Sequence, residues 1–97
     1  MEKFKQNVLK AIQLCNDEIQ KRNAGIEGES TKKQIEEVIL PELNTIIGLL
    51  DSNKLPAKDD RYLNSFAHAF TVWGWSMQEP TELFLLLTQL NNQYKEL

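Results

Sequence analysis

Apolar residues recur at helical spacing in four stretches of the chain, and these stripes predict its secondary structure. The stripes are Phe4-Val8-Ile12-Cys15-Ile19, Ile35-Ile39-Leu43-Ile46-Leu50, Tyr62-Phe66-Phe70-Trp73-Met77 and Leu83-Leu87-Leu90-Tyr94-Leu97. Intervals of three and four residues are typical of one face of an amphipathic helix, and no alternating run of strand length occurs. The pattern therefore predicts an all-α protein with helices over about residues 2–23, 31–51, 59–77 and 80–96.

The connections between these stripes are short, which predicts a single domain, residues 1–97, folded as an antiparallel four-helix bundle. Thr31 and Gln34 have the spacing of a capping box at the start of the second helix. Pro41 interrupts the second stripe. Because an internal proline removes a hydrogen bond and clashes with the preceding turn, helix 31–51 is expected to be kinked or split there. A single bent helix is the preferred interpretation.

The charge of the chain narrows the choice of partners. The net charge is −3, and residues 16–60 hold ten acidic against six basic residues. Phosphate binding needs clustered Lys and Arg, so neither nucleic acid nor an anionic membrane is an expected partner, whereas a basic protein fits this charge.

No apolar run approaches the roughly 20 residues of a membrane span. The charged N-terminal residues are unlike a signal peptide, so a cytoplasmic protein is expected.

Few residues are candidates for chemistry. His68 is the only histidine, and no nucleophile or orienting group is predicted beside it. Cys15, the only cysteine, lies in the first apolar stripe and is expected to be a buried structural thiol. A lone cysteine excludes an intrachain disulfide and a metal site built on thiolates. The sequence therefore predicts neither an enzyme nor a bound cofactor or metal.

The two tryptophans are only two positions apart, in the segment Phe70–Trp75 with the sequence FTVWGW. If this segment is helical, the rings point to opposite sides, with Trp73 in the core and Trp75 on the face of His68. One interpretation makes 59–77 the central helix, so that Trp75 lies under a neighbouring helix. The other places Trp75 with Leu85 in an exposed apolar patch for a protein partner or a second copy.

The acidic pairs also have two interpretations. Asp59 or Asp60 is suited to cap the third helix, and Glu36 and Glu37 complement the dipole at the start of the second. Alternatively, these four carboxylates face a basic partner.

In size, helical pattern and mild acidity the chain is similar to small bacterial immunity proteins, which cap a toxin made by the same cell. The segment RYLNSFAHAFTVWGW, residues 61–75, is the one expected to be diagnostic of such a family. The resemblance implies a non-enzymatic module that binds another protein, and it carries no site residues with it. The alternatives are a small regulatory or structural homodimer that uses the Trp75 and Leu85 patch, and a protein that binds a ligand inside the bundle. The predicted contact residues are Trp75, Leu85, His68, Arg61, Glu36, Glu37, Asp59 and Asp60.

Overall fold

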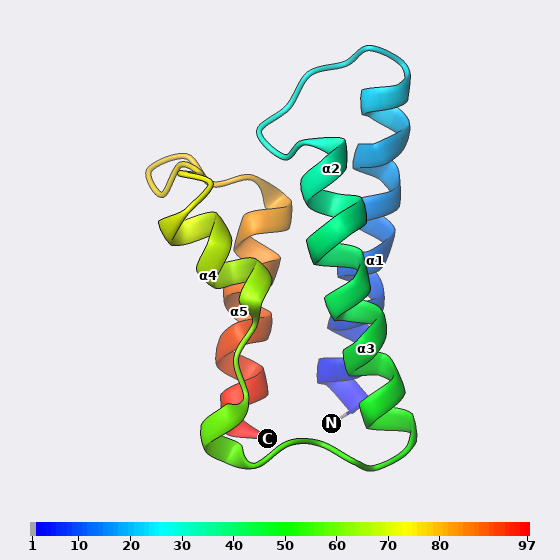
Figure 1. Ribbon diagram of the computed structural model, residues 1–97, viewed down its shortest axis with the longest axis vertical. Helices are drawn as coiled ribbons and strands as arrows, with labels where there is room; N and C mark the ends of the chain where they lie inside the picture. Colours follow the sequence, from blue (N-terminus) through cyan, green and yellow to red (C-terminus); the bar gives the residue numbers. More distant parts are fainter. Residues whose placement is uncertain (1) are drawn as a thin grey trace.

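The computed structural model describes residues 2–97, and within them every regular element is helical. The elements are α1 (Glu2–Asn23), α2 (Lys32–Gln34), the π-helix η1 (Ile35–Ile39), α3 (Leu40–Asp51), the 3-10 helix η2 (Lys58–Asp60), α4 (Asn64–Thr71) and α5 (Glu82–Glu96). In Figure 1 the chain runs up through α1, down through α2, η1 and α3, up through α4 and down through α5. The radius of gyration of 13.2 Å is close to the roughly 12.5 Å expected for a compact domain of this length. The prediction of an all-α protein is confirmed.

The helix that contains Pro41 is continuous rather than split. The ribbon passes from α2 through η1 into α3 without a break (Figure 1). Just before the proline the hydrogen bonding changes, because the Leu40 N–H donates to the Ile35 carbonyl, five residues back, as in a π-helix. A proline ring normally clashes with the carbonyl four residues before it. The wider π turn gives the Pro41 ring room, so the chain keeps its helical course.

The start of this helix is fixed by the predicted capping box. The Gln34 N–H donates to Thr31 Oγ1 at 3.0 Å, and the Thr31 N–H donates to Gln34 Oε1 at 2.9 Å. Two main-chain donors that would otherwise have no intrahelical partner are thereby satisfied.

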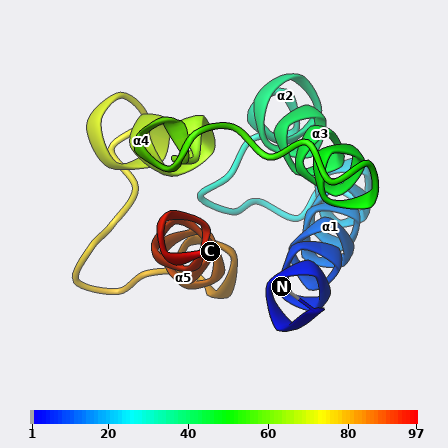
Figure 2. The ribbon, with the colours of Figure 1, turned by 90° about the horizontal axis from the view of Figure 1, so that it is seen from below.

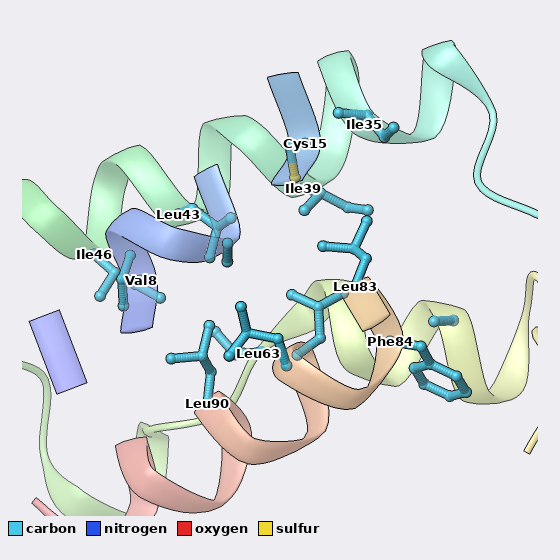
Figure 3. Close-up of a cluster of buried hydrophobic side chains, with 14 of the residues drawn as sticks. Val8, Cys15, Ile35, Ile39, Leu43, Ile46, Leu63, Leu83, Phe84 and Leu90 are labelled. Atoms are coloured by element: carbon cyan, nitrogen blue, oxygen red, sulfur yellow. The ribbon is translucent and has the colours of Figure 1, made fainter. Parts of the chain in front are cut away.

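The helix with the most buried residues is α5, not the predicted central helix 59–77. It contacts both α1 and α4, and in Figure 2 α4 lies above it and α1 to its right. It contributes more buried residues than any other element, namely Leu83, Phe84, Leu86, Leu87, Leu90, Asn91 and Tyr94. In Figure 3 its leucines meet the apolar side chains of α1, η1 and α3, labelled Val8, Cys15, Ile39, Leu43 and Ile46. At the far end of the same core, the ring of Phe4 stacks on that of Tyr94, with centroids 5.5 Å apart.

The third helix is much shorter than the predicted 59–77. Only Asn64–Thr71 is α-helical, and the segment 72–81 is an irregular connection. The predicted core stripe is wrong here, since Tyr62, Phe70 and Met77 are 53%, 49% and 61% exposed. The buried positions of α4 are the small residues Ser65 and Ala69.

Helix α4 is capped by a side chain from another helix. Its own N-cap residue, Leu63, has no side-chain acceptor, so the prediction that Asp59 or Asp60 caps this helix is wrong. Instead, the carboxylate of Glu42 in α3 accepts from the Asn64 N–H at 2.7 Å and from the Ser65 N–H at 2.8 Å. The Ser65 hydroxyl donates to the same carboxylate at 2.6 Å. Glu42 therefore sets where α4 starts and ties it to α3.

The loop between α1 and α2 is held down by Arg22. Its guanidinium donates to the Ser30 carbonyl at 2.8 Å, to Ser30 Oγ at 3.1 Å and to the Ile26 carbonyl at 3.3 Å. It also pairs with Glu18 at 3.0 Å on the preceding helical turn. Gly28 lies against this guanidinium, because a Cβ added at Gly28 would overlap the Arg22 nitrogens.

We expect Arg22→Ala to lower the free energy of unfolding by about 1–2 kcal/mol, because the side chain makes several charged hydrogen bonds in a half-buried setting. Gly28→Ala should cause a similar loss, since the added methyl group displaces the same guanidinium. Urea unfolding of the two single variants and the double variant checks this, and the two losses should not add. Gly48→Ala should be at least as stable as wild type, because an added Cβ there meets nothing within 4 Å and alanine favours the helix. A Gly28→Ala variant as stable as the wild type would contradict the prediction.

Candidate functional site

The two tryptophans lie side by side rather than on opposite faces. Helix α4 has ended before them, and Gly74 between them takes a left-handed φ of +66°. The main-chain N–H groups of Trp73 and Trp75 donate back to the carbonyls of His68 and Ala69, at 2.7 and 3.0 Å. As a result the two ring centroids are only 5.4 Å apart.

Trp75 belongs to the core. It is 4% exposed, and Phe84 of α5 packs against it edge to face at 5.5 Å. Its indole Nε1 has no hydrogen-bond partner among the described residues. The predicted exposed patch of Trp75 and Leu85 is therefore wrong, and the interpretation that put Trp75 under a neighbouring helix holds, although Trp75 itself is not helical. Trp73, which the stripe assigned to the core, is only half-buried.

Leu85 is exposed, and other apolar side chains are exposed at the same end of the molecule. Leu85, Phe70, Val72 and Met77 are 56%, 49%, 69% and 61% exposed. They come from the end of α4, the connection after it and the first turn of α5, which lie together at one end of the α4–α5 hairpin (Figure 1). We name these four residues the α4–α5 end surface. The stretch 62–78, which contributes three of them, contains no Asp, Glu, Lys or Arg.

A groove runs between the helix that contains η1 and the α4 side of the molecule. It consists of two hollows of about 300 and 470 Å³ that share Glu37 and Val38. We name it the π-helix groove. One wall follows a single helix face from Thr31 to Thr45, and the other wall carries Asn64, His68 and Trp73.

The groove contains one carboxylate that the fold does not use as a cap. Glu37 is 59% exposed, and Lys33, 4.0 Å away and 85% exposed, is its ion-pair partner. Glu36 makes the equivalent pair with Lys32 at 3.8 Å but does not line the groove. His68 is exposed and lies on the opposite wall, with its Nδ1 2.7 Å from the Asn64 carbonyl. The structure thus brings together two of the predicted contact residues, Glu37 and His68.

Arg61 and Asp59 lie elsewhere, in a hollow of about 490 Å³ beside η2 and the end of α5. The Arg61 guanidinium donates to the Pro56 carbonyl at 2.9 Å and to the Leu97 carbonyl at 2.6 Å. This arginine therefore fastens the end of α5 to the connection before α4. Asp60 is exposed in η2 and does not line this hollow.

Side chains that could act as a nucleophile or bind a metal ion are few, and they lie apart from one another. Cys15 is fully buried, and this burial raises the pKa of its thiol to about 12, so the thiol stays protonated. No cluster of three or more His, Cys, Asp or Glu side chains within residues 2–97 is arranged to hold a metal ion. None of the helices described is both long enough and apolar enough to cross a membrane.

Comparison of the chain with known proteins gives no match, whether to a family model, to a curated protein or to a solved structure.

Proposed function

We propose that the protein is a non-enzymatic module that binds another protein through the α4–α5 end surface. The observation that carries the proposal is the exposure of Phe70, Val72, Met77 and Leu85 at one end of the hairpin. Large apolar patches on the surface of a monomeric protein are often sites that contact a partner. Three of them belong to a stretch without charged residues, in a chain that is 26% charged. The interior of a protein interface is likewise depleted of charge.

In its sharper form the proposal is a cytoplasmic immunity or inhibitor protein, an antiparallel four-helix bundle that covers a basic partner. The net charge of −3 favours association with a basic surface. Glu36, Glu37, Asp59 and Asp60 are exposed and contribute part of the negative charge on the described surface. The up-down-up-down course of the helices supports the bundle (Figure 1).

A homodimer is the second candidate, with the α4–α5 end surface replacing the Trp75 and Leu85 patch. The absence of charged side chains from residues 62–78 favours it. A two-fold interface places the same patch on both subunits, and a patch with no charge avoids like-charge repulsion against its own copy.

We expect Leu85→Glu to abolish partner binding while leaving the stability of the fold within about 0.5 kcal/mol of wild type, because this side chain is already largely in water. Light scattering over a concentration series measures self-association. Capture from an extract of the source cell, with the wild type and the variant side by side, measures binding of a foreign partner.

Leu9→Glu is the matched control, since Leu9 is 48% exposed on α1, outside the end surface. It should behave as wild type in both experiments. Loss of self-association in Leu85→Glu alone would select the homodimer, and loss of a captured protein would select the foreign partner. If Leu85→Glu and Leu9→Glu behave alike in both experiments, the α4–α5 end surface is not the contact site.

A further inference from the structure

We propose that the π-helix groove binds an extended segment of a protein partner and that an arginine or lysine of this segment pairs with Glu37. The inference rests on the proposed function, because it describes the chemistry of a segment that a protein-binding module recognises. It adds a second contact region, separate from the α4–α5 end surface.

The dimensions of the groove fit a short peptide. Its helical wall runs from Thr31 to Thr45. At 1.5 Å per residue this is about 21 Å of helix. An extended chain rises about 3.3 Å per residue, so roughly six residues span the same length. The two hollows, of about 300 and 470 Å³, give room for side chains along this path.

The two hollows of the groove meet at η1. Glu37 and Val38, the two residues that the hollows share, lie in the π turn. π turns inside α-helices are frequent at functional sites. Pro41 explains why a π turn forms at this place in the helix. The turn in addition presents a carboxylate and an apolar side chain to the same space.

The charges of the groove favour a basic occupant. Its ionised side chains are Glu37, Glu42 and Lys33. The Glu42 carboxylate already accepts three hydrogen bonds from Asn64 and Ser65. Among the described residues, Glu37 is paired with Lys33 alone, at 4.0 Å and with both side chains largely exposed. Such a pair contributes little to stability, so a cation from a partner can replace Lys33 at small cost.

The apolar residues beside Glu37 can pack against the aliphatic part of an arginine or lysine side chain. Trp73 and Val38 are half-buried and line the hollow in which Glu37 lies. Arginine and lysine carry aliphatic stems that pack on apolar surface while the charged group stays at a polar site. The geometry therefore favours a basic residue over an acidic or a small polar one at this position of the segment.

NMR titration of the isotope-labelled protein tests the proposal, using a pool of capped hexapeptides with arginine fixed at the third position and mixed residues elsewhere. We expect amide shifts confined to Glu37, Val38, His68 and Trp73. A second pool with glutamate fixed at the third position should leave these signals unchanged. Glu37→Gln should raise the apparent Kd of the arginine pool roughly fivefold, the effect of removing one solvent-accessible charge pair.

Glu36→Gln is the matched control, because Glu36 also lies in η1 and also pairs with a lysine one turn away, yet it does not line the groove. It should leave the Kd unchanged. Equal weakening by the two variants, equal shifts with the two pools, or no confined shifts at millimolar peptide would each overturn the proposal. The Leu85→Glu variant distinguishes the α4–α5 end surface from the groove. If this variant loses the partner and the peptides do not bind the wild type, only the groove proposal is refuted. If this variant keeps the partner and the peptides bind the wild type, only the end-surface proposal is refuted.

Discussion

Trp75→Ala is expected to lower the free energy of unfolding by about 3–5 kcal/mol, the usual cost of truncating a large buried aromatic side chain. The indole is 4% exposed and packs against Phe84 and Trp73, so its removal leaves a cavity between α5 and the connection after α4. Small domains are stable by about 5–15 kcal/mol, so this variant should lose a large part of its free energy of unfolding. Chemical denaturation followed by circular dichroism measures the loss.

Trp75→Phe separates the packing of the ring from its polar atom. The Nε1 of Trp75 is buried without a hydrogen-bond partner among the described residues, and an unsatisfied buried donor is itself unfavourable. Phenylalanine keeps most of the aromatic contact and removes that donor, so it should cost far less than alanine. Trp73→Ala should also cost less, because this ring is only half-buried. If Trp73→Ala proves the more damaging of the two alanine variants, the assignment of the core ring is wrong.

Glu42→Ala is expected to lower the free energy of unfolding by about 2–3 kcal/mol, because it leaves the first N–H groups of α4 and the Ser65 hydroxyl without their charged acceptor. The loss should be local at first, since α4 has only eight residues and depends on this contact for its start. Amide hydrogen exchange should accelerate at Asn64 and Ser65 before it does in α1 or α5. Urea unfolding gives the global effect.

Ser65→Ala provides the comparison for Glu42→Ala. It removes one of the three hydrogen bonds and leaves the two from the main chain, so it should cost about 1 kcal/mol. The double variant should lose less than the sum of the two single losses, because both changes remove the same contact. Glu36→Ala, an exposed glutamate that caps nothing, should fall within about 0.5 kcal/mol of wild type. A Glu42→Ala variant no less stable than Glu36→Ala would show that α4 does not need this cap.

Three of the apolar stripes predicted their helices and buried residues correctly, because each faces one continuous core. These are the stripes of α1, of the helix through η1 and of α5. Val8, Cys15, Ile39, Leu43 and Leu87 are all fully buried, as expected for such stripes. In these segments the apolar spacing reports directly on tertiary packing. The capping box before Lys32 could also be predicted, since it depends on two residues that are close in sequence.

The segment 59–77 could not be predicted in the same way, because its structure depends on distant contacts and on one glycine. Its aromatic stripe has helical spacing, but the helix starts where Glu42 of α3 caps it. It ends before Gly74, whose left-handed φ turns the chain and brings Trp75 into the core. A glycine between two tryptophans is a helix-ending signal that the apolar spacing obscured. Once the helix ends early, Phe70 and Met77 lie on the surface.

The candidate site was accessible from the sequence only in part. Leu85 could be identified because it points away from the buried stripe of its own helix. Glu37 and His68 line one groove because α4 packs near η1. The spacing of residues within either helix does not predict that packing. The use of Arg61 as a structural clamp likewise requires knowing that the Leu97 carbonyl lies beside it.

The stacking of Phe4 on Tyr94 has a consequence for how the protein is made. The N-terminal part of a nascent chain leaves the ribosome first. Helix α1 therefore emerges well before α5, the helix against which it packs. At ordinary rates of translation this delay is on the order of ten seconds. During that time α1 and the helix through Pro41 lack their contacts with α5, and the apolar faces that pack on α5 stay in water. The nascent chain is therefore exposed to aggregation and to chaperones until α5 has been synthesised.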